Sequence, residues 1–214
     1  ELRERAEEAE AARPFAASLR DPGEVRLLAE IKRRSPSAGW IREDADPVEI
    51  AQAYAAGGAA ALSVLTDEEF FGGSLDALRR VRGAVDLPVL RKDFVIEPVQ
   101  VWEARAAGAD AILLIVRILD DALLVDLQAL ARELGMAALV EIHDLRELER
   151  AYRAEASLIG VNNRDLVTFR TDLRTTAEIA PRVDASVTLV AESGIRTPDD
   201  VKRMGDLGVD AVLV

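Results

Sequence analysis

The sequence has no cysteine and a single histidine, and both scarcities exclude kinds of functional site. Its 214 residues include 0 Cys and 1 His. Disulfide bonds, thiol catalysis and zinc–thiolate centres all need cysteine. A Ser-His-Asp triad or a metal site built from several histidines would have only one imidazole available. Any catalysis must therefore depend on other side chains.

The chain also has little positive charge and no long apolar run. Its 27 Lys and Arg residues stand against 39 Asp and Glu residues, so the formal net charge is −12. This balance repels phosphate backbones and anionic lipids, which argues against a nucleic-acid or membrane partner. No apolar run approaches the roughly 18–20 residues that a membrane span needs.

Short apolar runs alternate with helical patterns along the whole chain. The apolar runs predict strands at 27–32, 61–65, 88–92, 111–116, 137–142, 158–162, 187–192 and 210–214. The segments between them predict helices at 47–56, 74–82, 98–106, 120–134, 144–154, 172–180 and 198–207. Two of these helices begin with a capping residue followed by proline, at Asp46-Pro47 and Thr197-Pro198.

This alternation predicts the fold class. Strands that are apolar nearly throughout suit a parallel sheet covered on both faces. Eight strand–helix units without a linker predict one α/β domain over 1–214, a (β/α)₈ barrel. An open doubly wound sheet is less favoured, because no G-x-G-x-x-G follows the first strand.

The two ends of the sequence predict features that lie outside the eight strand–helix units. The run ELRERAEEAEAARPF at the start predicts an exposed helix, so we assign 1–26 to a helical extension. The chain ends at Val214 inside the apolar segment DAVLV. Because a domain rarely ends on an unprotected buried strand, we expect the loop and helix after the last strand to be missing from this sequence.

Polar residues close several of the predicted strands, where barrel enzymes keep their catalytic side chains. Glu30 and Lys32 are two positions apart, so both side chains leave the same face of the first strand. The full set of polar residues at strand ends is Glu30, Lys32, Lys92, Glu141, Asn162, Glu192 and Ser193.

Lysine usage makes two of these residues informative. The chain has three lysines, Lys32, Lys92 and Lys202, against 24 arginines, and the first two fall at predicted strand ends. Arginine keeps its proton in proteins, whereas lysine can be tuned to give and take one. A salt bridge at the rim would not explain carboxylates at three strand ends. We therefore expect general acid–base chemistry on a carbonyl or hydroxyl substrate, with Schiff-base catalysis as the other common use. Lysines would compete with a metal cation, so a metal site is disfavoured.

Two further features have less specific interpretations. The small residues of AESGI, at 191–195, lead into a predicted helix and can present backbone N–H groups to a phosphate, although a plain turn is equally compatible. His143 lies just past the fifth strand, where a role in the loop or the helix start is more common than catalysis.

The polar residues at the strand ends fall within a set of six strings: AEIKRRSPS (29–37), VLTDEEFFGGS (64–74), VLRKDF (89–94), LVEIHD (139–144), GVNNRDL (160–166) and AESGI (191–195). In this order and spacing they resemble the indole-3-glycerol phosphate synthases, and the likeness covers essentially the whole chain. The resemblance implies a (β/α)₈ barrel with an extra N-terminal helix, here 6–19, which would pack near the mouth of the active site.

The resemblance also implies a reaction. The substrate would be 1-(2-carboxyphenylamino)-1-deoxyribulose 5-phosphate, which closes a ring and loses CO₂ and water to give indole-3-glycerol phosphate. Neither a metal nor a cofactor is implied. The family context implies a cytoplasmic enzyme, either a monomer or one that associates with other tryptophan-pathway enzymes.

Residue roles follow from the same resemblance. Lys92 would be the general acid that activates the ribulose carbonyl, and Glu141 a proton acceptor or a stabiliser of developing positive charge. Lys32, paired with Glu30, would hold the substrate carboxylate and assist dehydration. Either Lys32 or Lys92 would protonate the departing hydroxyl.

The implied binding residues surround this centre. Asn162 and Glu192 would bind sugar hydroxyls, while Ser193 and Gly194 would bind the phosphate. Arg164 would orient Lys92. The expected mobile loop after the first strand comprises Ser35, Pro36 and Ser37. The expected apolar pocket for the anthranilate ring comprises Phe71, Phe94 and Leu113.

Two other barrel activities remain as alternatives. A phosphosugar isomerase such as phosphoribosylanthranilate isomerase needs one acid and one base, usually drawn from Cys, Asp or His, and this chain has no Cys. A Schiff-base aldolase would use Lys32 or Lys92 as a nucleophile.

Overall fold

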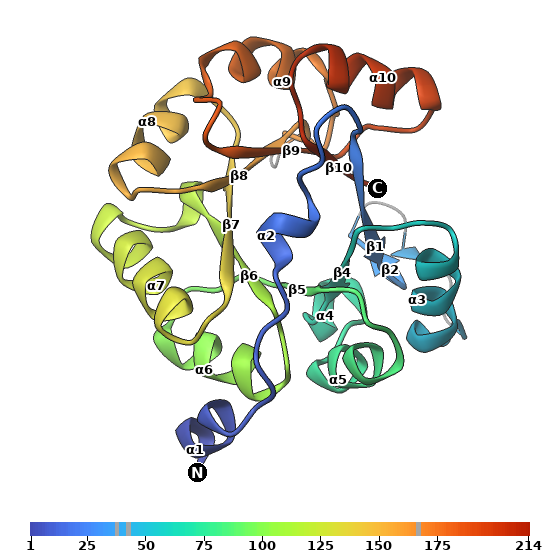
Figure 1. Ribbon diagram of the computed structural model, residues 1–214, viewed down its shortest axis with the longest axis vertical. Coiled ribbons are helices and arrows are strands. Elements are labelled where there is room, and N and C mark those ends of the chain that lie inside the picture. The colour runs from blue at the N-terminus through green and yellow to red at the C-terminus, as the bar shows by residue number, and fades with distance from the viewer. Residues whose placement is uncertain (37–38, 42–43, 166–167) are drawn as a thin grey trace.

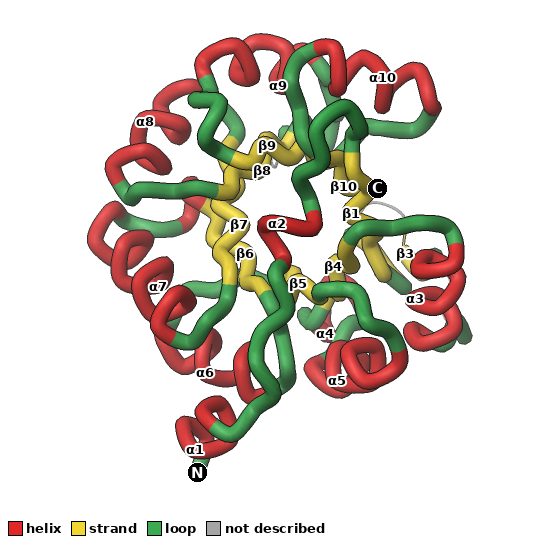
Figure 2. The backbone as a smooth tube through the Cα atoms, in the orientation of Figure 1, coloured by secondary structure: helices red, strands yellow, loops and turns green. Residues whose placement is uncertain are grey.

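The computed structural model describes residues 1–36, 39–41, 44–165 and 168–214, and its centre is a closed parallel barrel (Figures 1 and 2). Around the barrel the strands follow the order β1-β10-β9-β8-β7-β6-β5-β4, and β1 closes the ring by pairing with β4. The eight strands are β1 (Arg26–Ile31), β4 (Ala61–Leu65), β5 (Val89–Lys92), β6 (Ala111–Ile115), β7 (Ala137–Ile142), β8 (Leu158–Asn162), β9 (Thr188–Glu192) and β10 (Ala211–Leu213). The predicted (β/α)₈ barrel is confirmed.

Helices form a ring outside the strands (Figure 1). Asp46 caps α3 by accepting a hydrogen bond from the Val48 N–H, and Thr197 caps α10 in a capping box with Asp200. The ring comprises α3 (Pro47–Ala56), α5 (Leu75–Ala84), α6 (Pro98–Ala106), α7 (Asp121–Glu133), α8 (Leu145–Arg153), α9 (Arg174–Ile179) and α10 (Pro198–Asp206).

Shorter elements lie in the loops. The helix α4 (Glu68–Phe71) follows β4, and the 3₁₀ turns η1 (Val116–Ile118) and η2 (Ala180–Arg182) follow β6 and α9. After β1 the chain forms a small antiparallel ribbon of β2 (Arg34–Ser35) and β3 (Gly39–Trp40).

Alternation along each strand divides the buried residues into two clusters. One cluster, between strands and helices, includes Ile31, Val64, Ile112 and Ile159. The other fills the barrel interior and includes Leu28, Leu90, Leu113, Leu139 and Val190. Inward-facing positions are thus apolar in the middle of the barrel, so polar side chains at the strand ends lie above an apolar floor.

The N-terminal segment differs from the single helix expected at 6–19. It forms α1 (Leu2–Glu7) and α2 (Phe15–Ser18), with non-helical residues between them. Pro14 cannot donate a helical hydrogen bond, and Arg13 bonds elsewhere: its N–H to Asp110 and its guanidinium to the carbonyls of Val85 and Leu87.

These contacts place the segment at the amino ends of the strands. Asp110 precedes β6 and Leu87 precedes β5. Figure 2 shows α2 over the centre of the barrel, where Phe15 is 1% exposed within the interior cluster. The expectation that this segment packs near the mouth of the active site is therefore wrong, because it closes the opposite end.

Within the described residues, no helix is both long enough and apolar enough to cross a membrane.

Candidate active site

Charged side chains from three strands meet at the carboxyl end of the barrel. Lys92 Nζ, from β5, lies 3.0 Å from Glu192 Oε2 on β9 and 3.5 Å from Glu30 Oε2 on β1. The other oxygen of Glu30 accepts a hydrogen bond from Lys32 Nζ at 2.5 Å. The four side chains form one continuous chain of alternating charge, as the strand-end positions predict.

Glu192 is the most deeply buried of these four charged side chains. Its side chain is 1% exposed, and its Oε1 has no hydrogen-bond partner among the described residues. A Cβ added at Gly160 on β8 would lie 2.0 Å from that oxygen. Glycine at position 160 therefore provides the space in which the carboxylate lies.

The charges in this chain alter one another's protonation. Burial opposes the charge of Lys92, but the carboxylates of Glu192 and Glu30 outweigh it and raise the pKa of Lys92 above its usual value. Burial also opposes the charge of Glu30, yet the two lysines lower its pKa. For Glu192, burial dominates over the attraction of Lys92 and raises its pKa to about 7.

Glu141 lies on β7, between β6 and β8 in the barrel, and completes the polar mouth. Its side chain is 3% exposed, and Oε1 accepts a hydrogen bond from Asn162 Nδ2 at 3.1 Å. His143 Nε2 is 3.4 Å from the same oxygen. The carboxylate is also close enough to Lys92 to add to the rise in the pKa of that lysine.

The turn after β9 has an unusual backbone conformation. Ser193 and Gly194 both adopt left-handed φ values, 64° and 83°. Successive backbone N–H groups of a turn can form a concave set suited to an anion. The positions predicted for phosphate binding therefore have a backbone compatible with that role.

Asn163 is a site-supporting residue that the sequence reasoning missed. Its Nδ2 donates to the carbonyls of Glu192 and Ser193, and its Oδ1 accepts from the N–H and hydroxyl of Thr176. It is 2% exposed. A second Asn immediately after Asn162 was the available signal, but nothing in the sequence indicates that it bridges two strand ends.

The predicted apolar residues separate into two groups. The rings of Phe71 and Phe94 lie 6.4 Å apart at an angle of 40°, and Phe94 is 41% exposed. Leu113, 3% exposed, belongs to the barrel interior. Two aromatic rings thus meet beside the mouth, while Leu113 belongs to the floor.

The remaining predicted residues lie in the flanking loops. Ser35 belongs to the β2–β3 ribbon and Pro36 to its turn, whereas Ser37 is outside the described residues. Arg164 donates its N–H to Asn162 Oδ1 and its guanidinium to the Phe169 carbonyl. Its predicted action on Lys92 stays a prediction.

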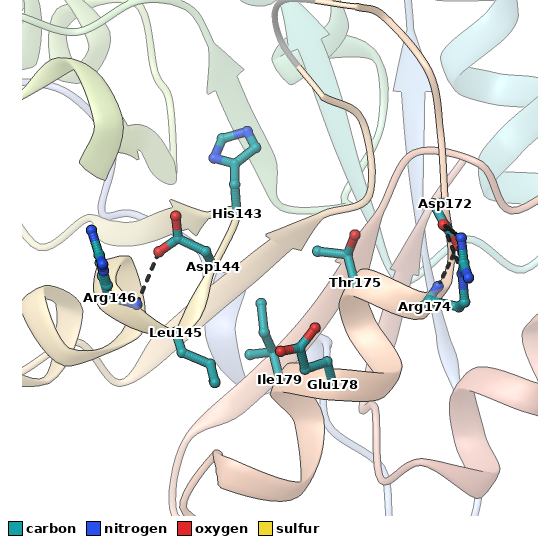
Figure 3. Close-up of a pocket in the computed structure, with 9 residues that line it drawn as sticks. All are labelled: His143, Asp144, Leu145, Arg146, Asp172, Arg174, Thr175, Glu178 and Ile179. Carbon is teal, nitrogen blue, oxygen red and sulfur yellow. Dashed lines mark hydrogen bonds and ion pairs between the residues drawn. The ribbon is translucent and has the colours of Figure 1, made fainter.

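A hollow lies outside the barrel, between the β7–α8 loop and α9 (Figure 3). It encloses about 600 Å³ and is lined in part by His143, Arg146, Thr175 and Glu178. The lysines and carboxylates of the barrel mouth do not line it. Across the described residues, no group of three or more His, Cys, Asp or Glu side chains is placed to hold a metal ion.

The chain is similar to known proteins over nearly its whole length. The family model described as "Indole-3-glycerol phosphate synthase" matches residues 1–214. Proteins of that name from Albidiferax ferrireducens and Laribacter hongkongensis are each 54% identical to this chain, over 94% and 100% of it and 78% and 82% of their own lengths.

Similarity to solved structures extends to more distant barrels. The N-acetylmannosamine-6-phosphate 2-epimerase from Clostridium perfringens superposes with a TM-score of 0.72 over 96% of this chain and 90% of its own, at 16% identity. That likeness concerns the fold alone, whereas the family match and the high identities concern the whole sequence. The chain belongs to the indole-3-glycerol phosphate synthase family.

Proposed function

We propose that this protein is a carbon–carbon lyase that converts 1-(2-carboxyphenylamino)-1-deoxyribulose 5-phosphate into indole-3-glycerol phosphate, CO₂ and water. The observation that carries the proposal is the buried charge chain at the barrel mouth, with Lys92 between Glu192 and Glu30. Family membership supports the same activity. The reaction needs protons delivered and removed at defined points, and this centre contains groups suited to both tasks.

Substrate binding begins with its two anionic groups. The left-handed turn at Ser193 and Gly194 would receive the phosphate through backbone N–H groups. Lys32, whose side chain is 31% exposed, stands at the outer end of the charge chain and would hold the substrate carboxylate. In the substrate, the aromatic ring lies between the carboxylate and the phosphate. The Phe71 and Phe94 rings, which lie close together, would offer this aromatic ring an apolar contact.

Ring closure forms a bond between the aromatic carbon that bears the carboxylate and the ribulose carbonyl carbon. Lys92 would donate a hydrogen bond and then a proton to the carbonyl oxygen. Two carboxylates hold that proton on Lys92. A sugar hydroxyl that binds Glu192 weakens this hold and makes Lys92 a better acid. Loss of CO₂ then restores the aromatic ring.

Dehydration requires one more proton donor and one acceptor. The former carbonyl oxygen leaves as water after a second protonation. Either Lys32 or Lys92 would donate this proton. Glu141 would accept the proton that leaves carbon as the indole double bond forms. Asn162 orients Glu141 by its 3.1 Å hydrogen bond.

The test compares two lysines of the same chain. Lys92→Met removes the buried ammonium, while Lys202→Met removes an exposed one on α10. Indole formation is followed by near-ultraviolet fluorescence, and released CO₂ is measured in parallel. General acid catalysis contributes about 10²–10⁴-fold, so Lys92→Met should lose at least about 10²-fold in kcat while Lys202→Met keeps the wild-type value. Near-normal turnover by Lys92→Met contradicts the assigned acid.

The cellular setting is part of the same proposal. A small phosphosugar derivative is the proposed partner, and the role in amino-acid biosynthesis supports a cytoplasmic location.

A further inference from the structure

His143 is a buried group that the proposed reaction leaves without a role. It follows β7 directly and lies on the same face as Glu141, two positions earlier. Its side chain is 5% exposed. In Figure 3 the ring points away from Thr175 and Glu178 of α9, which line the outer hollow. The imidazole thus lies between that hollow and the barrel mouth.

Glu147, in the first turn of α8, fixes one edge of the ring. Its Oε2 accepts the His143 backbone N–H at 2.7 Å and lies 3.1 Å from ring Nδ1. Its Oε1 accepts Arg117 Nε at 2.7 Å. Burial opposes the charge of Glu147, but these hydrogen bonds outweigh it and lower the pKa of Glu147. An ionised carboxylate only accepts hydrogen bonds, so Nδ1 carries a hydrogen.

The opposite edge of the ring faces the catalytic carboxylate. His143 Nε2 lies 3.4 Å from Glu141 Oε1 and makes no hydrogen bond within the described part of the chain. Because Nδ1 already bears a hydrogen, Nε2 is an acceptor in the neutral ring and a donor in the charged ring. The charged ring can therefore donate a hydrogen bond from Nε2 to Glu141 when that carboxylate is ionised.

We propose that His143 is a positioning residue for Glu141: held by Glu147, the charged ring donates a hydrogen bond from Nε2 that orients the Glu141 carboxylate. This inference rests on the proposed function. Glu141 so oriented removes the proton from substrate carbon, and the electron pair of the broken C–H bond forms the indole double bond. The ring keeps its own protons throughout this step.

Charged groups on other elements also act on Glu141 and the ring. Glu141 is close enough to Lys92 on β5 and to Glu192 on β9 to help raise the pKa of each. On the far side, Arg117 lies 3.7 Å from Asp144 and 2.7 Å from Glu147. Charges of both signs therefore lie on both sides of the ring. Replacing His143 removes the imidazole charge and leaves these other charges in place.

The kinetic test replaces only the edge that faces Glu141. His143→Asn keeps a short side-chain donor near the position of Nδ1 and removes Nε2. We expect kcat to fall about tenfold, the scale of one charged hydrogen bond, with KM within twofold and the acid limb of the kcat profile at higher pH. Asp144→Asn is the control: it alters the same loop and keeps a good N-cap for α8. Wild-type kcat and an unmoved acid limb in His143→Asn overturn the inference, as does an equal shift in Asp144→Asn.

A second measurement needs no turnover. Because the chain has 1 His, its ring nitrogens give one set of ¹⁵N NMR signals without assignment. Glu141→Gln and Glu147→Gln should each change the pH dependence of these signals, because each removes a carboxylate beside a ring nitrogen, and Asp144→Asn should have a smaller effect. A ring that titrates identically in Glu141→Gln overturns the inference. Absence of indole product from the wild-type protein contradicts the proposed function instead, and the titration still tests the Glu141–His143 contact.

Discussion

Gly160→Ala tests the active-site geometry with one added methyl group. Its Cβ would lie 2.0 Å from Glu192 Oε1, 3.1 Å from Cδ of the same residue and 3.3 Å from Leu139 Cδ1. Ordinary contact begins near 3.4 Å, so the carboxylate oxygen must withdraw by about 1.4 Å. Leu139 limits movement of the methyl group, and the only charged partner of Glu192 at short range is Lys92, 3.0 Å away, among the described residues. The methyl group therefore displaces the carboxylate that pairs with Lys92.

The expected effects are modest on stability and large on activity. Overpacking of a well-packed interior costs about 1–3 kcal/mol, which lowers Tm by roughly 2–12 °C for a domain of this size. A catalytic group displaced by about 1 Å can cost about 10²-fold in rate. We therefore expect kcat/KM to fall about 10²-fold in protein that remains folded at the assay temperature.

Gly83→Ala is the matched control. Gly83 lies in α5, and a Cβ there meets no atom within 4 Å. Alanine favours a helix over glycine by about 1 kcal/mol, so this variant should be slightly more stable and fully active. Steady-state fluorescence kinetics and thermal unfolding of both variants provide the comparison. If Gly160→Ala retains wild-type kcat/KM, the position of Glu192 does not matter to catalysis and the assigned geometry is wrong.

Two further predictions concern opposite ends of the barrel. Burial raises the pKa of Glu192 from 4.5 to about 7, so the contribution of Glu192 to stability is present below pH 4.5 and is lost as the pH rises through 7. Because Glu192→Gln does not titrate, this variant should gain stability relative to wild type as the pH rises over this range in urea unfolding. A stability difference that stays constant with pH would refute the assignment. Phe15→Ala removes the 1% exposed ring that fills the amino end of the barrel and should cost about 3–5 kcal/mol of unfolding free energy, while kcat of the folded protein stays unchanged; a specific loss of kcat would show that this end is coupled to the site.

Local patterns were sufficient to predict the strands and their order. The apolar run expected at 61–65 is the observed β4, and the run expected at 158–162 is the observed β8. Runs buried on both faces have a distinctive composition, which explains this agreement. The placement of Glu30 and Lys32 on one face also follows from the two-residue period of a strand alone.

The N-terminal segment shows where local patterns fail. Its composition favours helix, yet Arg13 makes hydrogen bonds to residues 72, 74 and 97 positions away. Such distant partners leave no trace in the local sequence. The same reason explains the omission of Asn163 and the modest role first assigned to His143, since the bonds of both residues become meaningful only when neighbouring strands are in place.

The sequence by itself determined the barrel, its family and the side chains that reach the carboxyl ends of the strands, because these follow from periodicity, composition and characteristic strings. Only the tertiary structure decided which charges touch and which protons they hold. Lys92 and Glu192 are 100 positions apart and meet at 3.0 Å. Electrostatic energy depends on distance and burial rather than on order along the chain, so protonation in this site arises only once the barrel has closed.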